Sequence, residues 1–170
     1  SAIRNQDKVG LILFTDRVEL YIPPAKGRIH IMRLIREALF FEPEGRGTDM
    51  KVALDFVNQM LKRRAIVFLV SDFSFPGDFA AVMAEARRKL QVTSKHHDVI
   101  ALSVNDPREY SIPEVGLLTV QDAESGELIE INTNNPTVRA RYETQAADRK
   151  TAVQKAIRSL GVDLLELQNG

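Results

Sequence analysis

Short apolar runs alternate with stretches of helical spacing along most of this chain of 170 residues. Almost continuous apolar sequence, which is typical of strands covered by helices on both faces, occurs at 8–15, 65–71 and 98–104. Apolar residues recur at helical spacing over 29–41, 48–61, 76–90 and 135–160. This alternation predicts an α/β fold with a doubly wound, mostly parallel sheet and helices on both faces.

Two segments depart from this alternation. Residues 18–22 alternate between apolar and polar side chains and end at Pro23 and Pro24, which predicts a half-exposed strand at a sheet edge that forms a hairpin with 8–15. Residues 116–132 contain two short strand patterns around a turn, which predicts a β-hairpin insertion. No linker or internal repeat divides the chain, so we expect one domain over 1–170.

Charge and composition exclude several classes of function. Lys and Arg together number 23, as do Asp and Glu, so the chain lacks the basic excess that binding to nucleic acid or an anionic membrane would need. The absence of cysteine excludes disulfides, zinc thiolates and a thiol nucleophile. No apolar run approaches the roughly 20 residues that cross a bilayer, so we expect a cytoplasmic protein that makes no membrane contact.

Thr48 and Asp72 are the first candidate site. Thr48 follows a loop with glycines at 45 and 47, and Asp72 directly follows the strand pattern at 65–71. Open α/β sheets bind ligands at the carboxyl ends of their strands, and hydroxyl and carboxylate oxygens suit a hard cation such as Mg²⁺. The alternative is structural: Thr48 caps a helix and Asp72 belongs to a turn.

Asp16, Asp72 and Asp106 form a second candidate set, because each closes an apolar run. If these strand ends converge, the three carboxylates could hold Mg²⁺ for phosphoryl or phosphodiester chemistry. Aspartate is also common in turns, which is the alternative explanation. The chain has no Gly-x-Ser-x-Gly elbow and no phosphate-binding glycine loop, so a serine hydrolase and a nucleotide-binding protein are disfavoured.

Two further groups of residues have both a structural and a functional interpretation. His96 and His97 precede the strand at 98–104 and are expected to be solvated rather than to bind a metal. The last predicted helix is rich in basic side chains with acidic ones between them, which indicates a solvated face or, alternatively, a docking surface for a partner. The basic residues are Arg139, Arg141, Arg149, Lys150, Lys155 and Arg158.

Several segments in the same order resemble one bacterial family. Residues 7–14, 21–24 with 26–28, and 71–73 are similar to the domain of unknown function 58 family, whose fold resembles the von Willebrand factor A domain. Thr48, followed five residues later by Ala53 and Leu54, resembles the threonine loop of such domains, and Asp72 resembles their aspartate loop. The hairpin at 120–131 and the helix that begins at 135 resemble the C-terminal part of the family.

The resemblance implies an incomplete metal site. In that superfamily the metal-ion-dependent adhesion site also needs an Asp-x-Ser-x-Ser loop after the first, central strand, and this chain contains no such motif. Thr48 and Asp72 alone supply too few oxygens for the octahedral shell of Mg²⁺, so we expect no metal in this chain and Mg²⁺ only in a longer parent protein. The missing strand would leave the strands at 8–15 and 65–71 with unpaired edges. Either these two strands pair directly, or another segment fills the gap, or two chains associate across it, as an exposed apolar edge favours.

The resemblance also implies a function. Members of the family are typically encoded beside MoxR-type AAA+ ATPases, so we expect a non-enzymatic adaptor or co-chaperone that binds protein partners. A partner carboxylate would complete the metal shell in the longer parent. The alternative is a Mg²⁺-dependent phosphohydrolase that uses Asp16, Asp72 and Asp106, and a third interpretation is a structural domain that binds nothing.

Overall fold

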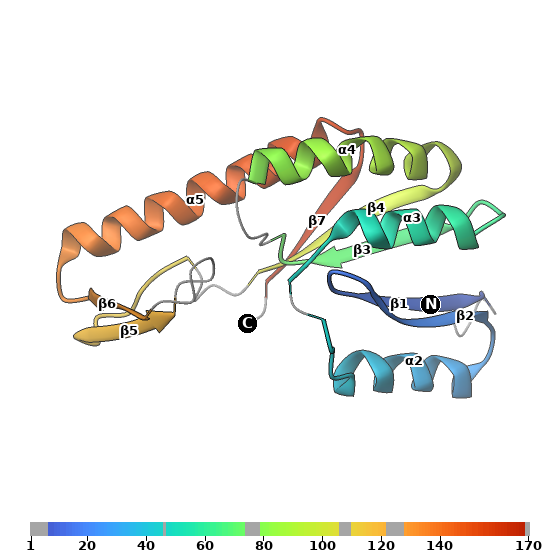
Figure 1. Ribbon diagram of the computed structural model, residues 1–170, viewed down its shortest axis with the longest axis horizontal. Helices are drawn as coiled ribbons and strands as arrows, with labels where there is room; N and C mark the ends of the chain where they lie inside the picture. The colour runs from blue at the N-terminus through green and yellow to red at the C-terminus, as the bar shows by residue number, and fades with distance from the viewer. Residues whose placement is uncertain (1–6, 46, 74–78, 106–109, 122–127, 169–170) are drawn as a thin grey trace. The chain divides into compact units, whose positions relative to one another are not determined.

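The computed structural model describes residues 7–45, 47–73, 79–105, 110–121 and 128–168, which belong to two compact units, 1–62 and 63–170. Each unit is described by itself, with the helix and strand labels of Figure 1. Together they confirm the mixed α/β class with a parallel sheet. The expectation of a single domain over 1–170 stays a prediction.

The first unit is an antiparallel hairpin with two helices. Strands β1 and β2 form the predicted hairpin, in a register that places Ile12 opposite Tyr21. Pro23 and Pro24 lie near the end of β2, where missing backbone donors are tolerated at an edge. The elements are β1 (Val9–Phe14), β2 (Val18–Ala25), α2 (Arg28–Phe40) and α3 (Met50–Met60).

Helix α3 carries most of the core of the first unit. It begins at Asp49, whose carboxylate accepts a hydrogen bond of 2.9 Å from the amide of Lys51, as an N-cap residue does. Leu54 on its inner side is 1% exposed, and the Phe56 ring meets Tyr21 of β2 edge-to-face at 5.0 Å. The helix cap is therefore Asp49, so the structural alternative that Thr48 caps this helix is wrong.

The second unit contains a parallel sheet and a separate hairpin. The sheet has the strand order β3-β4-β7, and the hairpin β5–β6 lies between β4 and the last helix in the sequence, as predicted for 116–132. The expected turn of this hairpin at 122–126 lies outside the described residues. The elements are β3 (Ile66–Ser71), α4 (Phe79–His96), β4 (Asp98–Asn105), β5 (Leu117–Gln121), β6 (Leu128–Asn132), α5 (Pro136–Arg158) and β7 (Asp163–Gln168).

Helix α5 has clear sequence signals at both ends. The Asn135 side chain accepts a hydrogen bond of 3.0 Å from the amide of Thr137, and Pro136 occupies the first turn, where its missing N–H costs nothing. Gly161 follows the helix at a φ of 69°, a left-handed conformation that favours glycine. The N-cap was predicted correctly because capping depends on local residues, whereas the helix ends at Arg158 with Ser159 as its C-cap, so the predicted end at Leu160 with Gly161 as the cap is wrong.

Helices α4 and α5 cover the same face of the parallel sheet (Figure 1). The crossovers β3–α4–β4 and β4–α5–β7 step in one direction across the sheet, and right-handed connections then place both helices on one side. Alternate strand residues confirm this arrangement, because Leu69, Ala101 and Ser103 are 7%, 1% and 6% exposed. This face forms the core of the second unit.

The opposite face of the parallel sheet is apolar and open. Phe68 of β3 is 57% exposed and Leu165 of β7 is 53% exposed. Ile66, Val70 and Leu167 share this face and are also exposed. Within the described residues of this unit, helices cover one face of the sheet, so the doubly wound arrangement with helices on both faces stays a prediction.

The two adjacent histidines differ from each other. Helix α4 continues to His96, beyond the predicted end near residue 90, and His97 is only 3% exposed. The His97 amide donates to the Thr93 carbonyl at 2.8 Å, so the backbone continues the helical turn. The expectation that both histidines are solvated is wrong for His97. Burial lowers the pKa of His97, the neighbouring His96 lowers it further, and Asp98 opposes the effect.

The lowered pKa of His97 predicts a stability loss in acid. The folded state disfavours the charged imidazole, so the unfolded state binds more protons below the ordinary pKa of 6.5. The free energy of unfolding should therefore fall as the pH drops below 6.5, by less than about 1.4 kcal/mol per pH unit, the limit for one proton. Urea denaturation between pH 7.5 and 5.5 measures this slope. His97→Gln should flatten the slope, and His96→Gln should flatten it less, because it removes only the contribution of the neighbouring charge and leaves the larger effect of burial. An unchanged slope in His97→Gln would contradict the assignment.

Candidate functional site at the carboxyl edge of the sheet

Asp72 is held in place by its neighbour Phe73. Asp72 directly follows β3 and is exposed, whereas Phe73 is 1% exposed and has a φ of 55°. The amide of Phe73 donates to the Ser71 hydroxyl at 3.0 Å. A bulky residue in the left-handed region is rare and strained, and its buried ring maintains the conformation. The sharp turn thus fixes Asp72 at the carboxyl end of the strand.

A network around Glu19 organises the loop before Thr48 in the first unit. The Glu19 carboxylate accepts hydrogen bonds from the Thr15 hydroxyl at 2.7 Å and from the amide of Gly45 at 2.6 Å. These two hydrogen bonds, together with Arg17, lower the pKa of Glu19 against an opposing effect of burial, and the Thr15 bond has the largest effect. The residue before α3, Asp49, donates its amide to the Thr15 carbonyl at 2.8 Å. The Thr48 loop is therefore fixed to the turn between β1 and β2.

Gly45 has no room for a side chain in this network. A Cβ at Gly45 would lie 2.1 Å from the Thr15 hydroxyl and 2.4 Å from an Asp16 oxygen. We expect Gly45→Ala to lower the free energy of unfolding by about 1–3 kcal/mol, the usual cost of forcing atoms into a packed site. Urea denaturation measures the loss, with Glu42→Ala, an exposed residue of the same connection, as control. Equal stability of the two variants would contradict this prediction.

The predicted metal residues are distributed over the two units. Thr48 and Asp16 belong to the first unit, and Asp72 belongs to the second. Asp106 lies outside the described residues. The described part of the chain contains no group of three or more His, Asp or Glu side chains arranged to hold a metal. Both the Thr48–Asp72 pair and the set of three aspartates therefore stay predictions.

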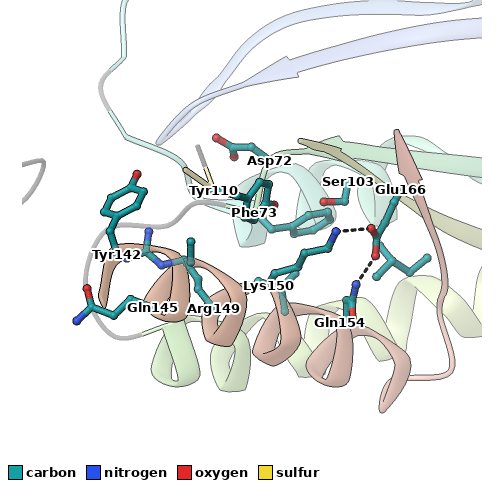
Figure 2. A pocket seen from close by; sticks show the side chains of 13 residues that line it. Asp72, Phe73, Ser103, Tyr110, Tyr142, Gln145, Arg149, Lys150, Gln154 and Glu166 are labelled. Atoms are coloured by element: carbon teal, nitrogen blue, oxygen red, sulfur yellow. Dashed lines mark hydrogen bonds and ion pairs between the residues drawn. The ribbon is translucent and has the colours of Figure 1, made fainter. Parts of the chain in front are cut away.

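A pocket of about 330 Å³ lies beside Asp72, entirely within the second unit. Figure 2 shows that it is bordered by Asp72 and Phe73, by Ser103 of β4, by Tyr110, and by Glu166 of β7. One side is formed by successive turns of α5, namely Tyr142, Gln145, Arg149, Lys150 and Gln154. The pocket thus lies where the predicted ligand edge of the sheet meets the basic last helix.

An ion pair forms the β7 side of the pocket. The Lys150 ammonium lies 2.7 Å from a Glu166 oxygen and 5.5 Å from the centre of the Tyr110 ring, and the Gln154 amide donates to the other Glu166 oxygen. The hydrogen bond from Lys150 lowers the pKa of Glu166, and the same bond raises the pKa of Lys150. Both groups stay charged at neutral pH, so this side of the pocket carries little net charge.

No pattern in the sequence predicts this pocket. Lys150 lies on a helix and Glu166 on the following strand, and neither belongs to a motif with a defined spacing. The basic residues of the last helix are evident in the sequence, but their spacing alone does not separate Lys150, which is paired, from Arg149 next to it. Only the packing of α5 against the sheet brings these side chains together.

A parallel sheet with helical crossovers and oxygen donors at its carboxyl edge defines an α/β domain of the open-sheet type. The chain belongs to the family described as "Protein of unknown function DUF58", which matches residues 1–152.

The relatives in this family are uncharacterised. An uncharacterised protein from Mycobacterium tuberculosis strain H37Rv is 29% identical over 164 residues, which cover 95% of this chain and 49% of that protein. An uncharacterised protein from Mycobacterium avium is 30% identical over 149 residues, with 86% of this chain and 83% of that protein covered. The chain thus spans about half the length of the M. tuberculosis relative.

A solved structure supports the fold. The crystal structure of the conserved hypothetical protein BatB from Bacteroides thetaiotaomicron superposes with a TM-score of 0.51 at 18% identity, covering 97% of this chain and 73% of that one. An aerotolerance-related membrane protein from Bacteroides fragilis has a TM-score of 0.46, which is too low to support an argument. None of the described helices of the present chain is both long and apolar enough to span a membrane.

Proposed function

We propose that this chain is a non-enzymatic protein–protein interaction module of the von Willebrand A type. It would act as an adaptor or co-chaperone with a MoxR-type AAA+ ATPase. The observation that carries this proposal is the open apolar face of the β3-β4-β7 sheet. Exposed apolar surface of this kind marks interaction sites in soluble proteins.

The edge of β3 adds a second means of association. In the described residues, β3 pairs with β4 on one side only, so the other side presents backbone donors and acceptors. Such an edge accepts a strand from another segment or another chain. A protein partner, a further segment of a longer parent, or a second copy of this chain could use this edge, and self-association would then compete with partner binding at high protein concentration.

The metal in this proposal belongs to the longer parent protein. The Asp72 carboxylate at the end of β3 and the Thr48 hydroxyl, which caps no helix, are oxygen donors of the kind that Mg²⁺ prefers. Two donors are fewer than Mg²⁺ requires, so a further loop must supply the others. Thr48 and Asp72 would contribute to holding the ion, and its positive charge would attract a carboxylate of the protein partner.

Binding of the AAA+ ATPase tests the proposal. We expect Phe68→Asp to weaken binding of a MoxR-type ATPase from the same genome by at least tenfold, because a buried unpaired carboxylate would be placed in the interface. Biolayer interferometry measures this affinity. Leu117→Asp is the control, because Leu117 is a 71% exposed apolar residue on the separate β5–β6 hairpin.

Two results would contradict this function. Equal binding by the Phe68→Asp and Leu117→Asp variants would show that the open face is not the docking surface. Turnover of phosphate esters with Mg²⁺ that Asp72→Asn abolishes would favour the enzymatic alternative.

A further inference from the structure

The two neighbouring cations of the pocket have different surroundings. Figure 2 shows that Lys150 reaches toward Glu166, whereas the Arg149 guanidinium lies toward Tyr142 at the other end of the pocket. Across the residues that the structure describes, no carboxylate or hydrogen-bond acceptor contacts the Arg149 side chain. Among the described residues, the Arg149 guanidinium at the Tyr142 end of the pocket therefore has no ion-pair partner.

Helix α5 is basic, whereas the lining of the pocket is balanced in charge. The helix has six basic and two acidic side chains, and the pocket is lined by Arg149 and Lys150 and by the carboxylates of Asp72 and Glu166, of which Glu166 pairs with Lys150. Tyr142, Gln145 and Arg149 lie three or four residues apart, so they share one side of the helix and border the same cavity. Together they offer a guanidinium fork, an amide and an aromatic ring.

We propose that this pocket binds an acidic side chain from an extended segment of the partner protein. The planar guanidinium of Arg149 matches both oxygens of a carboxylate, Gln145 can donate a further hydrogen bond, and Tyr142 packs on the aliphatic part. The inference rests on the proposed function and specifies the chemistry of its partner. It needs no metal, because the Arg149 guanidinium itself supplies the positive charge. Every group involved belongs to the second unit.

The size of the pocket favours a side chain over a cofactor. About 330 Å³ is at the lower end of the range for small-molecule sites, which suits one or two side chains of a peptide. Arg149 and Gln145 are exposed, so an extended segment can reach them from solvent. The acidic partner is favoured by charge because the helix that would face it is basic.

Peptide binding in EDTA tests this site. The probes are a fluorescein-labelled peptide with glutamate residues and the same peptide with glutamine in their place. We expect the chain to bind the glutamate peptide at least tenfold more tightly in fluorescence anisotropy, and Arg149→Gln to remove most of that difference. Arg149→Lys should recover only part of it, because an ammonium cannot form the paired contact.

Arg141→Gln is the matched control, since Arg141 is an exposed arginine of the same helix that does not line the pocket. An equal loss in Arg141→Gln would show general charge attraction and overturn the site. Equal binding of the glutamine peptide would overturn it as well. If inorganic phosphate occupies the Arg149 site at lower concentrations than the glutamate peptide does, the pocket binds a phosphate ligand and not an acidic segment.

The peptide assay and the ATPase-binding assay test the pocket and the proposed function separately. Failure of the peptide assay with intact binding of the AAA+ ATPase removes only the pocket assignment. Loss of ATPase binding in Phe68→Asp has no bearing on the peptide in EDTA, because Phe68 lies on the opposite face of the sheet from the pocket.

Discussion

Replacing Phe73 with alanine is expected to lower the free energy of unfolding by about 3–5 kcal/mol, as removal of a buried phenyl ring usually does. Phe73 is 1% exposed and is among the largest fully buried side chains of the described residues. Because small domains have a total stability of roughly 5–15 kcal/mol, this loss removes a large part of it. Urea denaturation followed by far-UV circular dichroism measures the change.

The backbone at Phe73 makes the prediction more specific. Its φ of 55° is costly for any residue with a Cβ, by about 1–2 kcal/mol. Phe73→Gly should therefore be more stable than Phe73→Ala, although glycine is usually the more destabilising of the two. If Phe73→Gly has both a higher urea midpoint and a higher thermal midpoint than Phe73→Ala, the result would support a strained turn at this residue.

Phe68→Ala provides the matched control for this ring. Phe68 lies on β3 a few residues earlier but is 57% exposed on the open face of the sheet. Its removal should cost no more than about 1 kcal/mol, because little area is lost from the core. A loss at Phe68 as large as that at Phe73 would mean that the open face is buried in solution.

Leu54→Ala is expected to produce the second large effect, a loss of about 2–5 kcal/mol. Leu54 is 1% exposed in the core of the first unit. This unit comprises residues 1–62, and a core of that size rarely supplies more than about 3–5 kcal/mol by itself. The substitution should therefore bring the first unit close to unfolding at room temperature.

The same variant tests the prediction of one domain over 1–170. Native-state hydrogen exchange follows the amides of both units separately. If the chain is a single cooperative domain, amides of β4 in the second unit should lose protection together with those of α3. Unchanged protection of β4 in Leu54→Ala would show two independently folding units and would contradict the prediction.

The candidate site was predictable in part. Asp72 was identified as a strand-end carboxylate because a run of apolar residues ends directly before it, and the structure confirms that position. The pairing of Thr48 with Asp72 depends on how separate elements approach one another, which a local pattern cannot specify. The pocket beside Asp72 was missed for the same reason, since Arg149, Lys150 and Glu166 acquire their relation only through packing.

The sequence by itself determined the order and type of the elements, the hairpin between β4 and α5, and the N-cap of α5 at Asn135. These features depend on periodicity and on neighbouring residues, so they are encoded within short windows. Only the tertiary structure decided that His97 is buried, that the described helices of the second unit cover one face of the parallel sheet, and that Lys150 is paired whereas Arg149 lies toward Tyr142. Burial and pairing result from contacts between residues far apart in the chain, and apolar periodicity shows which face can be covered without showing what covers it.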